Sequence, residues 1–167
     1  IYMHKDGKWQ SYNVATGEIG NMSGRAYARR MLATVKDRSL YLVYADGTEK
    51  LIAERENDQI TYGDFVSRNE FGIDGGIFWA PDSSKVAFYR KDETKVTTFP
   101  LLDITTRTGS LKEIKYPMAG MDSENVQLGI YDLASGKTTY AKVDDFGYDQ
   151  YLTNISWSPD ATKIFIQ

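Results

Sequence analysis

The chain has 167 residues, of which 41% are hydrophobic, 26% charged and 13% aromatic, and this balance predicts one folded domain with a sizeable core. The formal net charge of −3 excludes a general attraction to nucleic acid or to an anionic membrane surface. The absence of cysteine excludes disulfides, the single histidine, His4, excludes a cluster of histidine ligands, and no apolar run reaches the roughly 18 residues that span a membrane.

Strand patterns dominate the chain. Residues 25–36 are the best candidate for a helix, but their apolar positions are irregularly spaced. Residues 40–44 form a β-branched and aromatic run that ends at Asp46-Gly47, a pair that predicts a hairpin turn with both residues at positive φ. Further strand-like runs cover residues 77–79, 85–89, 126–133 and 137–143. We therefore expect an all-β fold.

Two units of the sequence recur. Residues 77–88 match residues 155–165, and both read strand, Trp, a small residue, Pro-Asp turn, Lys, strand. Residues 12–18 match residues 131–137 around a Gly turn. In each unit the Trp would fill the space between stacked sheets, Pro would fix the turn and Asp would accept from the turn amides. Stacked small sheets indicate a β-propeller, and one irregular β-sandwich is the alternative.

The spacing of the repeats predicts an insertion. The two Trp-Pro-Asp units lie 78 positions apart, whereas a blade takes about 40 to 50 residues, so we place an insertion at about residues 91–125. The chain then holds about three blades and cannot close a ring alone. It begins without methionine and ends inside an apolar run, so we expect residues 1–167 to be a fragment of a larger propeller domain.

Five segments resemble the N-terminal propeller of the dipeptidyl peptidase IV family, especially its bacterial members. Residues 65–73 read Phe-Val-Ser-Arg-Asn-Glu-Phe-Gly-Ile, residues 76–82 read Gly-Ile-Phe-Trp-Ala-Pro-Asp, and residues 116–120 read Tyr-Pro-Met-Ala-Gly. Residues 32–41 and 86–90 add a strand pair and a strand in the family's order. The resemblance covers about residues 32–167.

The resemblance implies an activity for the parent protein. Members of the family are serine exopeptidases with an eight-bladed propeller and a C-terminal α/β-hydrolase domain, and they release N-terminal dipeptides with proline or alanine second. This chain has no Gly-x-Ser-x-Gly motif, so it lacks the nucleophile and holds no catalytic residue. His4 alone, without an oriented acid and an oxyanion hole, does not make a catalytic site.

The family's propeller selects substrates by their free N-terminus, through two glutamates on a short segment between strands. That pair falls on Asn69 and Glu70, so one carboxylate matches and the other is replaced by an amide. Tripeptide release or an inactive relative therefore stays open, and so does a solvated Glu70 paired with Arg68. The family also uses an arginine to bind the carbonyl group of the substrate. Arg25, Arg29 and Arg30 cannot be aligned to that arginine, so this role is not assigned.

The resemblance also implies a partner for the insertion. In the family an arm of the propeller reaches a second subunit, so we expect Phe99, Tyr116 and Met118 to lie in a homodimer contact. The remaining partners are the peptide N-terminus and the parent's hydrolase domain, with no nucleic acid, cofactor or metal. Asp144, Asp145 and Asp149 lack calcium-loop spacing.

Two alternatives remain open. The first is a non-enzymatic interaction propeller similar to TolB, and the second is a carbohydrate-active propeller, for which no acid pair is evident. The sequence itself does not fix the cellular location, and resemblance to bacterial relatives implies the periplasm or the cell surface.

Overall fold

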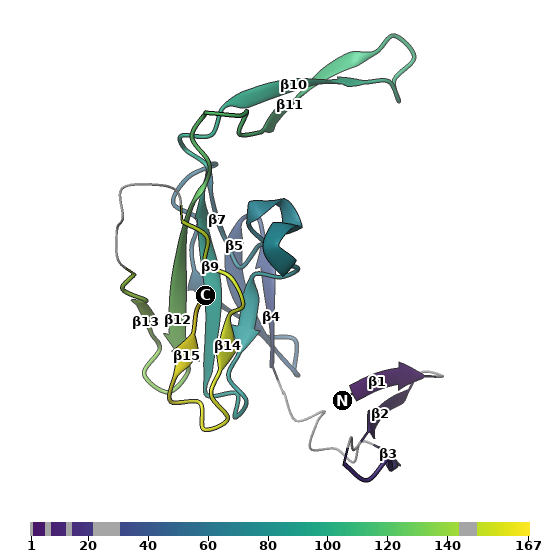
Figure 1. The fold of residues 1–167 in the computed structure, drawn as a ribbon, viewed down its shortest axis with the longest axis vertical. Helices are drawn as coiled ribbons and strands as arrows, with labels where there is room; N and C mark the ends of the chain where they lie inside the picture. Colours follow the sequence, from purple (N-terminus) through teal and green to yellow (C-terminus); the bar gives the residue numbers. More distant parts are fainter. Residues whose placement is uncertain (1, 6–7, 13–14, 22–30, 144–149) are drawn as a thin grey trace.

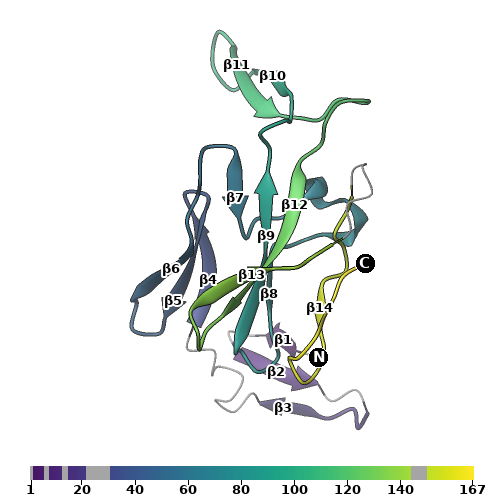
Figure 2. The same cartoon turned by 90° about the vertical axis from the view of Figure 1, so that its left-hand side faces the viewer.

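The computed structural model of the chain describes residues 2–5, 8–12, 15–21, 31–143 and 150–167. Within these ranges the chain forms short β-strands joined by tight turns, together with one 3₁₀ helix, η2 (Ser67–Gly72). Figures 1 and 2 show the arrangement in two views. The strands are β1 (Tyr2–Lys5), β2 (Lys8–Tyr12), β3 (Ile19–Asn21), β4 (Met31–Lys36), β5 (Ser39–Tyr44), β6 (Glu49–Ala53), β7 (Ile60–Tyr62), β8 (Ile77–Trp79), β9 (Lys85–Asp92), β10 (Thr98–Asp103), β11 (Ser110–Lys115), β12 (Asn125–Asp132), β13 (Lys137–Tyr140), β14 (Ser156–Trp157) and β15 (Ile164–Phe165).

The strands form small antiparallel sheets that follow one another along the chain. The first two contain β1-β2-β3 and β4-β5-β6, and the central sheet has the order β13-β12-β9-β7 with β8 also paired to β9. Two two-stranded sheets, β10-β11 and β14-β15, complete the set. The all-β expectation is confirmed, and the candidate helix is not found in its described part, because residues 31–36 form β4.

The repeated Pro-Asp turns adopt the same geometry in both copies. Asp82 accepts a hydrogen bond from the amide two residues later at 2.9 Å, and Asp160 does the same at 3.1 Å. The residue after each aspartate is left-handed, with φ of 60° at Ser83 and 56° at Ala161. The predicted role of the aspartates as acceptors for turn amides is therefore confirmed.

The hairpin between β5 and β6 forms where it was predicted, but the backbone of its turn differs from the prediction. Gly47 has a φ of 82°, whereas Asp46 is not among the residues with positive φ. The Gly47 amide donates to the Tyr44 carbonyl at 2.9 Å, and Asp46 Oδ1 accepts from the Thr48 amide at 2.9 Å. This longer loop needs only one left-handed residue, and the Asp46 side chain closes it.

Two apolar clusters hold the sheets together. In the first, Leu40 and Leu42 of β5 pack with Val86 and Phe88 of β9, and Trp79 packs against this cluster. The second is built from β9, β12 and residues beside η2, and Trp157 packs against it. The indole Nε1 of Trp157 also donates to the Phe78 carbonyl at 3.0 Å. Each tryptophan of the repeat thus joins its own sheet to another, as predicted.

The hairpin formed by β10 and β11 lies outside both clusters. Figures 1 and 2 show it standing beyond the ends of β9 and β12, away from the other sheets. Its two strands pair with each other from Thr98↔Lys115 to Asp103↔Ser110. It occupies the part of the chain where the sequence predicts an insertion.

Candidate functional site

Glu70 lies on a loop that leaves the central sheet and returns to it at the same place. This loop, residues 64–76, is named here the Glu70 loop. The Gly63 amide donates to the Tyr89 carbonyl at 2.8 Å, and the Tyr89 amide donates to the Gly76 carbonyl at 3.0 Å. Both ends of the loop are therefore fixed to one buried residue of β9.

The two ends of the Glu70 loop pass so close together that one of them must be glycine. A Cβ atom on Gly76 would lie 2.0 Å from the Asp64 carbonyl oxygen, a distance that no side chain can tolerate. Asp64 in turn forms an ion pair with Lys91 of β9, with Oδ2 and Nζ 3.1 Å apart. The loop base is thus fixed by a close backbone approach and by a half-buried charge pair.

The Glu70 loop contains helix η2, which the sequence did not predict. Val66 and Ile73 flank the helix, and both are buried in the second apolar cluster with Tyr89. The Ile73 amide donates to the Glu70 carbonyl at 3.0 Å and closes the last turn. The helix is missed because its six residues carry no helical periodicity and are held by residues distant in the sequence.

The start of η2 has an unusual cap. Its N-cap residue is Val66, whose side chain makes no cap hydrogen bond. The Ser67 amide instead donates to Glu124 Oε1 at 2.6 Å, from a residue 57 positions further along the chain. Ser67 has a φ of 53°, a conformation that L-residues other than Asn and Asp seldom adopt. A side chain from another segment therefore stabilises the first turn of the helix.

Glu70 itself is exposed on this anchored helix. Phe71, which follows it, has a φ of 56° and packs against Tyr151, with ring centroids 4.5 Å apart and ring planes tilted by 43°. The two rings are 54% and 48% exposed. A carboxylate beside an exposed aromatic pair can hold an ammonium group and contact apolar atoms next to it. The structure describes the backbone of Asn69 in η2 but not its side chain.

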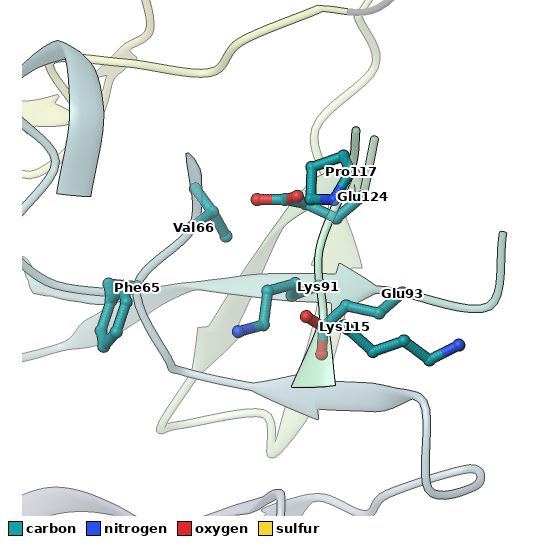
Figure 3. A pocket seen from close by; sticks show the side chains of 7 residues that line it. All are labelled: Phe65, Val66, Lys91, Glu93, Lys115, Pro117 and Glu124. Carbon is teal, nitrogen blue, oxygen red and sulfur yellow. The ribbon is translucent and has the colours of Figure 1, made fainter. Parts of the chain in front are cut away.

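A small polar pocket of about 190 Å³ lies beside the start of the Glu70 loop. Figure 3 shows its lining, with the Glu124 carboxylate directed toward Val66. The pocket is smaller than the roughly 300 Å³ at which ligand cavities begin, so it is not a site for a peptide. Its lining residues are Phe65, Val66, Lys91, Glu93, Lys115, Pro117 and Glu124.

The strongest shifts in pKa belong to a different cluster, formed by β7, β9 and the connection between β6 and β7. Hydrogen bonds from Arg90 and then Tyr62 lower the pKa of Glu56 to about 2. Burial, followed by the hydrogen bond to Glu56, raises the pKa of Tyr62. Arg90 binds both oxygens of Glu56 at 2.8 Å, and its pKa is raised by that contact. The three groups satisfy one another, which is typical of a structural ion pair.

The other candidate residues are not brought together by the structure. His4 lies in β1 opposite Trp9, and nothing is described of its side chain. The aspartates of residues 144–149 and the arginines of residues 25–30 lie outside the described residues. In the described ranges no group of three His, Asp or Glu side chains is placed to hold a metal ion. No helix in those ranges is long and apolar enough to cross a membrane.

The residues of the predicted dimer contact lie around the β10–β11 hairpin. The rings of Phe99 and Tyr116 pack together with centroids 6.0 Å apart. Tyr116 and Met118 are both exposed in part. The more exposed apolar side chains were missed by the sequence analysis, namely Leu102, Ile104 and Leu111, which are 67%, 80% and 73% exposed. Strand alternation does not reveal them, because the hairpin has no buried face.

Comparison with known proteins identifies the class. The chain superposes on a protein from Bacteroides ovatus described as a dipeptidyl aminopeptidase IV with a TM-score of 0.72 and 38% identity, over 99% of this chain and 24% of that one. Dipeptidyl peptidase 4 of Porphyromonas gingivalis has the same fold, with a TM-score of 0.71 and 21% identity over 95% of this chain and 24% of that one. The fold is therefore part of the β-propeller of these enzymes, as predicted.

The sequence comparisons identify the family. Residues 21–167 match the dipeptidyl peptidase IV N-terminal region. Dipeptidyl-aminopeptidase B of Aspergillus niger is 28% identical over 96% of this chain and 21% of its own length. The chain belongs to the dipeptidyl peptidase IV N-terminal family, and it spans about a fifth to a quarter of the length of these relatives.

Proposed function

We propose that this chain is the substrate-selecting part of a serine exopeptidase that releases N-terminal dipeptides, and that Glu70 binds the α-ammonium of the substrate. The observation that carries the proposal is the exposed carboxylate of Glu70 on a helix whose loop is fixed to β9 at both ends. The anchoring matters because a group that recognises charge must already be in place when the ligand arrives. The family membership of residues 21–167 supports the same assignment.

The chemistry of a single carboxylate explains how the substrate is chosen. A free N-terminus carries a compact positive charge that pairs with Glu70, whereas an internal peptide bond leaves the carboxylate desolvated and unpaired. Asn69, next to Glu70, offers a carbonyl oxygen as an acceptor for the same ammonium. An amide in place of a second carboxylate predicts weaker selection for the amine.

The rest of the reaction belongs to the parent protein. We propose that a C-terminal α/β-hydrolase domain supplies the serine, histidine and aspartate, and that substrates carry proline or alanine second. The names of the relatives from Bacteroides ovatus and Aspergillus niger, both dipeptidyl aminopeptidases, support the release of dipeptides. We also place the parent in the periplasm or at the cell surface, on its similarity to bacterial members.

Replacement of Glu70 tests the proposal in the full-length protein that contains this chain. Glu70→Ala and Glu70→Gln each remove one partner of a desolvated charge pair, which costs about 2–5 kcal/mol. The expected loss in kcat/KM for a free-amine Xaa-Pro chromogenic substrate is about 30- to 4,000-fold. Asp74→Asn, which changes an exposed carboxylate at the end of the same loop, is the control and should leave kcat/KM within about twofold.

The companion variant Asn69→Glu restores a second carboxylate and should increase the preference for free-amine over N-acetylated peptides. If both Glu70 variants keep the wild-type kcat/KM, Glu70 has no part in selection and the proposal fails. A full-length protein that cleaves no N-terminal dipeptide would favour an interaction propeller instead.

We also propose that the parent is a homodimer and that the β10–β11 hairpin lies in the contact. The hairpin exposes large apolar side chains from both strands, and Leu102 lies directly opposite Leu111. Exposed Leu and Ile side chains that no core covers favour a protein partner. Phe99, Tyr116 and Met118 extend this surface toward the base of the hairpin.

A further inference from the structure

The contact between Glu124 and Ser67 joins two parts of the chain with different roles. Glu124 is the residue before β12, so it lies where the chain returns from the hairpin. Ser67 is the first residue of η2, and Glu70 lies three residues later on the same helix. The Glu124 carboxylate is half-buried and accepts the Ser67 amide at 2.6 Å and the Ser123 hydroxyl at 3.2 Å.

The geometry of η2 makes this contact important for the position of Glu70. A helix normally takes its first cap from its own N-cap side chain, but Val66 has no polar atom to offer. Ser67 is also left-handed, which costs free energy that the surroundings must offset. A charged acceptor makes a stronger hydrogen bond than a neutral one, so the carboxylate is well suited to hold this amide.

We propose that Glu124 is a positioning residue for substrate selection, holding the first turn of η2 so that Glu70 points at the substrate amine. This inference rests on the proposed function of Glu70. It adds a residue that the resemblance does not assign, and that only the folded chain brings to the site. Buried Val66 and Ile73 hold the helix against the second apolar cluster, and Glu124 holds the conformation of its first turn.

The test uses two inhibitors of the full-length protein, an aminoacyl pyrrolidide with a free α-amine and its des-amino counterpart. Glu124→Ala should weaken binding of the amine-bearing inhibitor by on the order of tenfold, because a displaced carboxylate loses its aligned contact. Binding of the des-amino inhibitor should stay within about twofold, since it does not use Glu70. Glu124→Gln keeps a carbonyl acceptor at the same reach and should restore most of the affinity.

Two control variants separate the possible outcomes. Glu54→Ala removes an exposed carboxylate between β6 and β7 and should leave the affinity for both inhibitors unchanged. Glu70→Ala tests the proposed function itself, because wild-type affinity for the amine in that variant would overturn the role of Glu70. If Glu70→Ala loses affinity for the amine-bearing inhibitor and Glu124→Ala keeps it, only the positioning role is wrong.

Two results would overturn the proposal in favour of a purely structural role. The first is that Glu124→Ala loses affinity for both inhibitors to the same extent. The second is that Glu124→Gln fails to restore affinity for the amine-bearing inhibitor. If Glu124→Ala does not fold, Glu124→Asp provides the same measurement, because it keeps the charge and shortens the reach. It should weaken amine binding selectively, and equal effects on the two inhibitors would contradict the positioning role.

Discussion

The central sheet and the β10–β11 hairpin are made of similar residues but use them in opposite ways. In the central sheet Val86, Phe88 and Leu128 are almost fully buried between neighbouring sheets. In the hairpin Leu102 and Leu111 are paired across the strands yet mostly exposed. The difference teaches that the repeated units build the scaffold, whereas the hairpin, which packs in neither apolar cluster, presents its apolar side chains at the surface. The Glu70 loop lies between these cases, since it is anchored in the core but carries an exposed acid.

The largest effect on stability should come from the joint between the scaffold and the Glu70 loop. Gly76→Ala would place a Cβ atom 2.0 Å from the Asp64 carbonyl oxygen, so the backbone must move. Strain of this kind costs about 1–3 kcal/mol. Calorimetry of the full-length protein should show a lower Tm, and inhibitor binding should show a loss of selection for the free amine.

The neighbouring glycine is the matched control for that variant. A Cβ atom on Gly75 would meet nothing within 4 Å, and its φ is not in the left-handed region. Gly75→Ala should therefore change the free energy of unfolding by less than about 0.5 kcal/mol. Equal losses in the two variants would show that the close approach at Gly76 does not limit the fold.

A smaller effect should come from the ion pair between Glu56 and Arg90. The folded pKa of Glu56 is about 2, below its ordinary value of 4.5, so the pair stabilises the fold above about pH 4.5. That contribution is lost as the pH falls from about 5 to 2. Because the Glu56 side chain is 48% exposed, we expect at most about 1 kcal/mol.

The pH dependence can be isolated with Glu56→Gln. The variant should unfold more easily than wild type at pH 7, and the difference in unfolding free energy should shrink toward pH 3. Glu54→Gln, at an exposed position on the same connection, should show no such trend. A difference that stays constant between pH 7 and pH 3 would contradict this assignment.

The smallest effect on stability should come from substitutions in the hairpin, which we expect to change dimerisation and not folding. Tyr116→Glu combined with Met118→Glu, or Leu102→Lys combined with Leu111→Glu, which places opposite charges across the strands, should alter the unfolding free energy of the subunit by less than about 0.5 kcal/mol. Each double variant should nevertheless give a folded monomer by light scattering. If both double variants keep the wild-type molar mass in solution, the hairpin is not the dimer contact. Lys137→Glu on β13 is the control for a change of charge alone.

The sequence was a good guide wherever local chemistry decides the structure. The Pro-Asp turns and the strands beside them could be predicted because Pro, Asp and alternating apolar residues act over a few positions. The same holds for the Asp46-Gly47 hairpin, although its turn conformation differed from the prediction. The extra strand β7 was not recognised, because its three residues have no Pro-Asp turn motif beside them, whereas the equally short β8 precedes such a turn.

The site was harder to predict because distant residues build it. The resemblance indicated Glu70, but η2 depends on Val66 and Ile73 packing into a cluster and on Glu124 from beyond the hairpin. Tyr89 fixes both ends of the loop through its backbone, and its sequence position gives no sign of this role. Such contacts depend on how the sheets are stacked, which periodicity alone does not define.

The hydrogen bond of Trp157 has a consequence for how the protein folds while it is being synthesised. The Trp157 indole donates to the Phe78 carbonyl, and the Tyr89 hydroxyl donates to the Leu152 carbonyl at 2.6 Å, so one hydrogen bond runs each way between the later and the earlier segment. The ribosome releases the earlier segment first, and its acceptor and donor are in place before their partners emerge. Each new blade can thus be completed on a finished template, and a circular permutation that begins between residues 90 and 152 would reverse the order of both pairs.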